Sequence, residues 1–364
     1  MTRSDVADGD RKRPAIPAAV TESIEVGDVF GVQTVQRGKY LLDPPFARTA
    51  PPTDGRPRAR VGPYELVGRF PSSRTTMVFL AHKTSQFGIL RRAVVKWAGR
   101  QLDQFATSRE QLLDEARVIA FLEHPNLVKI LDFAEDAAGM YLALEYVPGP
   151  DLRRVFSALM KRGEAMPAPL ACFLGVEVLN GLAHAHDAVG PDGAPLDIVH
   201  RDVNPSNVLV SNDGHVKLTD FGMVHMKGRL QAPTAPHIVK GKYRYMAPEY
   251  IQDNNLTAQA DLYGTGLMLF ELLTGELCFM GDEPAKTMGR IVHHGVPYDR
   301  LDKVKMPRAL KKILRRATAR EPKDRYATAR DMAADLERVL EKEKAYVSAS
   351  AFAAFLARME MPKV

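Results

Sequence analysis

The pattern of apolar residues in this 364-residue chain changes near residue 145, and that change restricts the fold more than any other feature. One segment before this point, SREQLLDEARVIAFLE, has helical periodicity, and the chain after residue 150 is mainly helical. Five other segments before it are rich in β-branched and aromatic residues, as is typical of strands: YELVGRF, MVFLAHK, RRAVVKWA, NLVKILDFAED and GMYLALEYV. We therefore predict an α+β fold with a small antiparallel-sheet lobe at 63–144, a connector at 145–150 and a larger helical lobe at 151–342. A ligand pocket is expected in the cleft between the lobes.

The segments that flank these lobes differ in composition. Residues 1–62 contain the pairs Pro44–Pro45 and Pro51–Pro52 and scattered arginines, which predicts a mostly disordered tail. Apolar and polar residues alternate at 26–42, which leaves a strand or a docked segment as the alternative there. Residues 343–364 are predicted to form a C-terminal helical extension.

Cysteine usage and hydropathy indicate the cellular compartment expected for this chain. Cys172 and Cys278 are the only cysteines and belong to no CxxC or Cys/His cluster, so we expect a reducing compartment and two buried thiols. The first residues are charged and lack the apolar region of an export signal. The most apolar windows, 170–186 and 262–280, both contain glutamates. We therefore expect a cytoplasmic protein without a membrane span.

Positive charge is concentrated at 303–330, where eleven Lys/Arg residues face two acids. Such a segment could meet nucleic acid or an acidic partner. Its run KKILRRATAR, however, alternates with apolar residues at helical spacing, and no zinc spacing or RNA-stacking motif accompanies it. We interpret it as a solvated helix face and expect no nucleic-acid partner.

Four short motifs follow one another in a fixed order. AVVK ends at Lys96, and His200-Arg201-Asp202 precedes Asn207 at the spacing H-R-D-x-x-x-x-N. The tripeptides D-F-G, beginning at Asp220, and A-P-E, ending at Glu249, complete the set. Each motif alone is weak, but the ordered set is specific. From about residue 64 to about residue 340 the chain resembles the bacterial eukaryotic-like (Hanks-type) serine/threonine protein kinases, which implies the bilobal protein-kinase fold.

The resemblance implies that the chain uses ATP with Mg²⁺, or with Mn²⁺ in its place. Phosphoryl transfer requires positioning and charge neutralisation rather than covalent work by the protein. Asp202 would accept or orient the proton of the attacking hydroxyl, and Asn207 and Asp220 would supply oxygen ligands to the metal. Lys96 would hold the α- and β-phosphates, paired with Glu115 of the helix in the first lobe.

Other positions of the nucleotide site follow from the same resemblance. Leu144 would be the gatekeeper, Asp261 would brace the catalytic loop, and Glu249 would pair with Arg325. The expected nucleotide contacts are the hinge residues Glu145 and Val147, Asp151 near the ribose, and Val78, Val94 and Leu209 around the purine. Val94 stands where the family usually has alanine, which predicts a tighter pocket.

The phosphate loop departs from the family pattern. Gly68 begins it, but Pro71, Ser73 and Thr76 stand where the glycines of G-x-G-x-x-G are expected. Glycine lets a backbone approach phosphate closely, and Pro71 has no N–H to donate. Each lost hydrogen bond to phosphate is worth about 1.5–3 kcal/mol. We predict a raised KM for ATP, unless the hydroxyls of Ser73 and Thr76 or the guanidinium of Arg74 replace those bonds.

Two further departures lie near Asp202. Asn204 replaces the lysine usually found two residues after the catalytic aspartate, and Lys242 replaces a threonine in GKYRYMAPE. Our hypothesis is that Lys242 supplies the cation that Asn204 lacks. The alternative is a basic loop residue that faces the substrate.

Arg201 marks the class of kinases whose activation loop is ordered by a phosphate against that arginine. Thr234 is the only hydroxyl residue between Gly222 and Gly241, so it is the predicted autophosphorylation site, reached through a transient dimer.

Three functions are compatible with these motifs. The leading interpretation is an active kinase that phosphorylates serine or threonine of protein substrates. The second is a pseudokinase scaffold that binds nucleotide weakly, because the loop lacks its glycines. The third, a kinase for small molecules or lipids, is disfavoured by the A-P-E motif, which resembles a peptide-binding platform.

Overall fold

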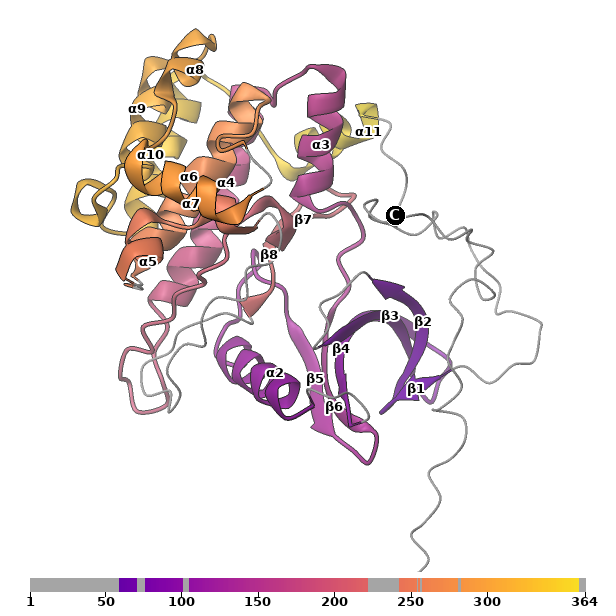
Figure 1. The fold of residues 1–364 in the computed structure, drawn as a ribbon. Helices are drawn as coiled ribbons and strands as arrows, with labels where there is room; N and C mark the ends of the chain where they lie inside the picture. The colour runs from indigo at the N-terminus through magenta and orange to yellow at the C-terminus, as the bar shows by residue number, and fades with distance from the viewer. Residues whose placement is uncertain are drawn as a thin grey trace, which may run out of the picture.

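The computed structural model describes residues 59–70, 76–100, 105–221, 242–253, 255, 257–280 and 283–359, and the statements below concern these residues. Two lobes are visible in Figure 1, one built on a curled sheet and the other on helices, as predicted. Residues 1–58 of the tail predicted at 1–62 lie outside the described residues, as do the loop residues Pro71, Ser73 and Arg74 and the predicted phosphorylation site Thr234.

The smaller lobe contains a six-stranded sheet in the order β1-β2-β3-β4-β6-β5, with every neighbouring pair antiparallel. Helix α2, Phe105–Ile119, packs against this sheet through a stripe that includes Leu112 and Ala116. The strands are β1 Arg60–Val61, β2 Tyr64–Phe70, β3 Met77–Thr84, β4 Leu90–Gly99, β5 Ile130–Glu135 and β6 Gly139–Glu145. Strand β1 lies within the segment predicted as the tail, and it is ordered because it pairs with the start of β2.

The larger lobe is mainly helical. Its α-helices are α3 Leu152–Arg162, α4 Ala168–His186, α5 Pro248–Asp253, α6 Ala258–Thr274, α7 Pro284–His293, α8 Tyr298–Lys303, α9 Arg308–Ala317, α10 Ala329–Lys342 and α11 Ala349–Arg358. Short 3-10 helices are η2 Pro205–Asn207, η4 Lys242–Tyr245 and η5 Pro322–Asp324. A two-stranded hairpin, β7 Val208–Val210 with β8 Val216–Leu218, lies where the lobes meet (Figure 1).

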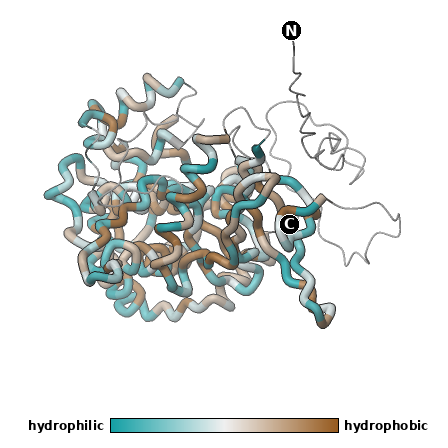
Figure 2. The backbone as a smooth tube through the Cα atoms, turned by 90° about the horizontal axis from the view of Figure 1, so that it is seen from below, coloured by the Kyte–Doolittle hydropathy of each residue, from teal (hydrophilic) through white to brown (hydrophobic). Residues whose placement is uncertain are grey.

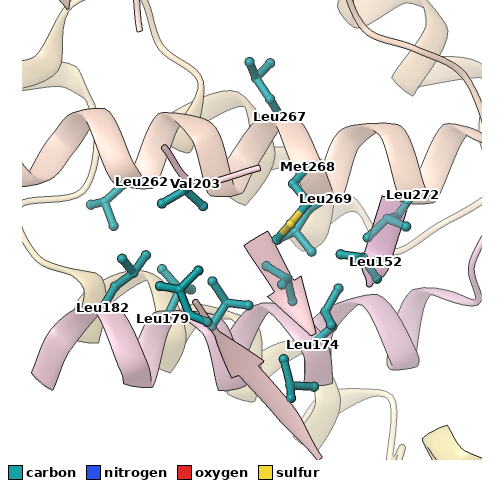
Figure 3. Close-up of a cluster of buried hydrophobic side chains, with 14 of the residues drawn as sticks. Leu152, Leu174, Leu179, Leu182, Val203, Leu262, Leu267, Met268, Leu269 and Leu272 are labelled. Carbon is teal, nitrogen blue, oxygen red and sulfur yellow. The ribbon is translucent and has the colours of Figure 1, made fainter. Parts of the chain in front are cut away.

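The core of this lobe is built on α4 and α6. Figure 3 shows leucines of the two helices facing each other, among them Leu174 and Leu179 of α4 and Leu269 and Leu272 of α6. Apolar stretches of the chain gather inside the body and polar stretches lie toward its edge (Figure 2). Among the described residues, α4 is the one helix long and apolar enough to cross a membrane, but 67% of its apolar window is buried inside the protein. A core helix passes the same test.

Both cysteines are buried and unpaired, as predicted. Burial raises the pKa of the Cys172 thiol to about 12 and raises that of Cys278 well above its usual range. The thiols therefore stay protonated at neutral pH and act as small apolar core residues. In the basic segment, α9 buries Leu310, Ile313 and Leu314 and leaves its charged side chains on the opposite face, so this helix is amphipathic, as interpreted from its sequence.

Candidate active site

Lys96, Glu115 and Asp220 meet between the two lobes. The Nζ of Lys96 lies 2.6 Å from Glu115 Oε1 and 3.0 Å from Asp220 Oδ1. Strand β4 carries Lys96 and helix α2 carries Glu115, so packing of α2 on the sheet brings the pair together. Burial by itself would lower the pKa of Lys96, but the charges of Asp220 and Glu115 outweigh burial and hold that pKa above its usual value. The ammonium therefore stays charged.

Strand register explains which side chains share a sheet face with Lys96. Lys96 is directly opposite Val78 on β3, while Val94 is opposite Leu80 on β3 and Leu144 on β6. Residues that lie opposite each other, or two apart on one strand, point to the same face. Val78, Val94 and Leu144 therefore lie on the face that presents Lys96, which is the arrangement expected of the roof of a purine site.

The catalytic-loop carboxylate is held by two asparagine amides. Asn204 Nδ2 donates to Asp202 Oδ1 at 2.7 Å, and Asn207 Nδ2 donates to Asp202 Oδ2 at 2.9 Å. Each amide also donates to the Asp202 carbonyl, at 2.9 Å from Asn204 and 2.8 Å from Asn207. Asp202, Asn204 and Asn207 are all buried, so these bonds fix both oxygens of the carboxylate in place.

The two asparagines differ in whether their amide oxygen is already used as a hydrogen-bond acceptor. Asn204 Oδ1 accepts a hydrogen bond from Ser206 N at 2.9 Å, which caps the short helix η2. The Asn204 amide is thus engaged at both ends. Asn207 gives both of its amide protons to Asp202, so its Oδ1 is the remaining acceptor. Asn207 can therefore offer an oxygen to a metal ion while it holds Asp202.

Asp261 on α6 supports the loop from the core of the larger lobe. Its carboxylate accepts hydrogen bonds from His200 N and Arg201 N, each at 2.8 Å, and contacts His186 Nε2 at 2.8 Å. Burial alone would raise the pKa of Asp261, but the hydrogen bond from His186 and the charges of His186 and His200 hold it below its usual value. Arg201 has φ of 69°, a left-handed conformation that these bonds stabilise. The brace implied by the resemblance is present.

The hinge is fixed by its side chain as well as by its backbone. Glu145 Oε1 accepts from Lys217 Nζ at 2.8 Å and from Lys129 N at 2.8 Å. Lys217 belongs to β8 and also donates to the carbonyl of Leu127, so it connects the hinge to the hairpin that precedes Asp220. Val147 is buried next to this junction in the main core.

Asp151 and Leu209 lie beside the hinge. Asp151 caps α3, accepting from Arg154 N at 2.8 Å, and burial raises its pKa above the usual value. It also forms an isolated bridge with Leu209 of β7, which is half-buried against the main core. These two residues therefore lie together at the edge of the expected nucleotide site.

Of the predicted phosphate-loop residues, the structure describes Gly68 and Thr76. Gly68 is buried in β2 opposite Leu80, next to a register shift that follows Leu66, and Thr76 is half-buried just before β3. Lys242 begins η4, and its side chain lies outside the described part of the structure. The proposed exchange of roles between Lys242 and Asn204 therefore stays a hypothesis.

Residues near the end of the activation segment are held by two buried acid groups. Glu249 and Arg325 form a two-pronged ion pair with both N···O distances at 2.7 Å, as the resemblance implied. Tyr245 OH donates to Glu271 Oε2 at 2.6 Å, and Cys278 N donates to Glu271 Oε1 at 3.0 Å. Burial raises the pKa of Glu271 to about 7. The end of this segment is thereby tied to α6 through Tyr245, and α5 is tied to the chain after η5 through Arg325.

Three residues of the site were not predicted as part of it: His186, Lys217 and Glu271. His186 and Glu271 adjoin long apolar stretches, which was the available signal in the sequence, whereas no such stretch surrounds Lys217. Glu271 was noticed only as an acid that argued against a membrane span.

The model of the protein kinase domain family matches residues 86–336. The chain belongs to the protein kinase family. The relatives described below are bacterial, which supports the prediction of a bacterial Hanks-type kinase. It is 33% identical over 297 residues to tyrosine-protein kinase MasK of Myxococcus xanthus, an alignment that covers 81% of this chain and 46% of MasK.

Several of the similar proteins are named serine/threonine-protein kinases, among them PknL and PrkC. PknL of Mycobacterium tuberculosis is 36% identical over 228 residues, which is 63% of this chain and 54% of PknL. PrkC of Bacillus subtilis is 32% identical over 232 residues, which is 63% of this chain and 34% of PrkC. The aligned part of the chain thus corresponds to about half of these relatives or less.

Proposed function

We propose that the chain is an ATP- and Mg²⁺-dependent protein kinase that transfers the γ-phosphoryl group to serine or threonine hydroxyls of protein substrates. The observation that carries this proposal is the joint geometry of Lys96, Glu115 and Asp220 with the doubly held carboxylate of Asp202. A chain that had lost catalysis would have no need to keep the contacts of Lys96 with Glu115 and Asp220 together with a carboxylate held on both oxygens at Asp202.

The donor groups present fit a magnesium ion. Mg²⁺ prefers hard oxygen ligands and is usually bound by one or two protein groups together with phosphates. Asp220 offers a partly exposed carboxylate and Asn207 offers the Oδ1 that Asp202 leaves unused. A bound Mg²⁺, or Mn²⁺ in its place, would supply charge neutralisation for the phosphates.

The protein's own residues then divide the remaining tasks. Asp202 orients the attacking hydroxyl and accepts its proton, because its two oxygens are fixed by Asn204 and Asn207. Lys96 stays charged and binds the α- and β-phosphates, while Glu115 keeps its side chain directed toward the nucleotide. The purine lies under Val78 and Val94, with the hinge at Glu145 and Val147, Asp151 near the ribose and Leu209 as its floor.

Incubation with γ-labelled ATP and Mg²⁺ or Mn²⁺ tests the proposal. Wild-type protein is expected to label itself and a generic protein substrate, and Lys96→Met is expected to lose most of that label. Equal labelling of both proteins would favour the pseudokinase scaffold instead. That second function is favoured by the composition of the phosphate loop, where Pro71 cannot donate a backbone hydrogen bond.

The acceptor hydroxyl needs its own test, because MasK is named a tyrosine kinase and Asn204 replaces the lysine typical of serine/threonine kinases. Acid hydrolysis of labelled protein separates the outcomes. Phosphoserine and phosphothreonine are expected, with Thr234 as the autophosphorylation site opposite Arg201 in a transient dimer. Phosphotyrosine alone would overturn the assignment. We also propose a cytoplasmic location, which the two unpaired cysteines support.

A further inference from the structure

Helix α11, Ala349–Arg358, follows the part of the chain that the kinase family model matches, yet it is firmly docked on the larger lobe. Its buried residues Phe352, Phe355, Leu356 and Met359 have the i, i+3, i+4, i+7 spacing of one helix face. Ser348 caps its first turn, with the side-chain oxygen accepting from Ala351 N. This helix is therefore an ordered part of the domain.

Two contacts define where α11 docks. The ring of Phe352 packs edge-on against Phe173 of α4, with centroids 6.2 Å apart. The backbone of the first turn meets the turn between β7 and β8 at Gly214. A Cβ atom on Gly214 would lie 1.8 Å from Ala349 O and 2.8 Å from Ala353 N. The two backbones touch, so the position of α11 and the position of the hairpin cannot change independently.

The opposite side of the same hairpin touches the hinge. Val210 N donates to Pro150 O at 2.9 Å, and Asn212 N donates to Pro148 O. A Cβ atom on Gly149 would lie 2.0 Å from Val210 O. The β7–β8 hairpin is thus held between the hinge and α11, and the closest backbone approaches on its two sides lie at glycines, Gly149 and Gly214.

This hairpin carries residues of the nucleotide site at both ends. Leu209 lies on β7, and β8 leads through Thr219 to Asp220. A shift of the turn at Gly214 moves both strands, because Val208 pairs with Leu218 and Val210 with Val216. Close-packed protein interiors transmit strain, so a displacement of the turn at Gly214 is expected to reach Leu209 and Asp220.

We propose that α11 is a positioning element of the kinase site, which holds the β7–β8 hairpin against the hinge and so sets the affinity for nucleotide. This inference rests on the proposed kinase function. Disturbing α11 should weaken binding of ATP and of unreactive ATP analogues alike. The turnover number at saturating ATP should change less than Kd, because Asp261 of α6 holds the backbone of His200 and Arg201, next to Asp202, although Thr219 N also donates to Asn207 O.

Two variants disturb the contact from its two sides. Gly214→Ala places a methyl group against Ala349, and Phe352→Ala removes the ring that docks α11 on α4. Each is expected to raise the Kd of an ATP analogue, measured by titration calorimetry, by roughly 2- to 30-fold. Phe352→Leu, which keeps an apolar side chain at this position, should bind the analogue more tightly than Phe352→Ala. KM for ATP should rise in parallel with Kd, while kcat should change less than either.

Matched controls separate positioning from general loss of stability. Gly88 has φ of 77°, close to the 84° of Gly214, and a Cβ atom there meets nothing within 4 Å. Gly88→Ala therefore introduces the same backbone strain in a hairpin turn without the contact. Leu310→Ala truncates a fully buried side chain of α9. Both controls should lower the melting temperature without changing Kd.

Hydrogen exchange tests the proposal on the wild-type protein, so the result does not depend on whether the variants fold. Coupling between two sites is reciprocal, so saturating nucleotide should slow exchange of the α11 amides and leave those of α9 unchanged. The proposed role of α11 would be overturned if its exchange did not change, or if Gly214→Ala and Phe352→Ala bound the analogue as tightly as wild type. Neither result would affect the proposed kinase function. Wild-type protein that binds no nucleotide at all would overturn the proposed function, and the inference with it.

Discussion

The position of Asn204 gives the sharpest prediction about catalysis. Asn204→Ala removes the 2.7 Å bond to Asp202 Oδ1, the bond to the Asp202 carbonyl and the cap on η2. Loss of the charge-assisted bond alone is worth about 1.5–3 kcal/mol. If this energy holds the carboxylate in its reactive orientation, kcat should fall by about 10- to 150-fold, since 1.4 kcal/mol corresponds to a factor of ten.

The neighbouring asparagine is the control for this prediction. Asn207 also holds Asp202, but its Oδ1 is left over for the metal. Asn207→Ala should therefore lower kcat and also raise the Mg²⁺ concentration that gives half-maximal rate, whereas Asn204→Ala should leave the Mg²⁺ dependence unchanged. Both variants can be assayed by ADP release at saturating ATP across a series of Mg²⁺ concentrations.

Two results would refute this reasoning. A kcat of Asn204→Ala close to that of wild type would show that the orientation of Asp202 does not depend on the amide. An equal shift in Mg²⁺ dependence for both variants would show that the division of tasks between the two asparagines is wrong. Asn204→Lys, which restores the residue typical of the family, distinguishes charge from hydrogen bonding at this position.

Two further predictions concern buried acids. The pKa of Glu271 is raised by burial to about 7 from a usual value of 4.5; the unfolded chain thus loses the proton first, and stability falls as pH rises between these values. Glu271→Gln should remove this dependence, so that its stability relative to wild type increases by up to about 3 kcal/mol over that range in denaturant titrations, and parallel curves for the two proteins would contradict it. Arg325→Ala leaves the buried carboxylate of Glu249 without its partner, and the free energy of unfolding should drop by about 3–5 kcal/mol. The double variant with Glu249→Ala should recover part of that loss, and a simple sum of the two single effects would count against the ion pair as the cause.

Much of the site could be predicted because its chemistry is written in short motifs. Four residues could be located from the spacing within their motifs: Lys96, Asp202, Asn207 and Asp220. Glu115 could be located from its position in the helical segment that follows Lys96. The two-lobed fold followed from the change in residue pattern near residue 145, because strands and helices have different apolar periodicity.

The features that were missed depend on contacts between distant parts of the chain. His186 and Asp261 are 75 residues apart, and Lys217 and Glu145 are 72 residues apart. No local pattern records such pairs. The glycines at 149 and 214 were unremarkable in the sequence, because only the folded backbone shows what a Cβ atom would meet there. The docking site of α11 could not be predicted for the same reason, because the sequence of a short amphipathic helix does not show which surface its apolar face packs against.

The central claim is that Asp202 lies in an assembled and working phosphotransfer site. The most direct test compares wild type with Asp202→Asn in the rate of transfer from γ-labelled ATP to protein in the presence of Mg²⁺. The substitution keeps the size of the side chain and removes the carboxylate. Transfer by wild type should be rapid and that of Asp202→Asn should fall by two orders of magnitude or more, in keeping with the roughly 10²–10⁴-fold contribution of a general base. Equal transfer by the two proteins would contradict the account.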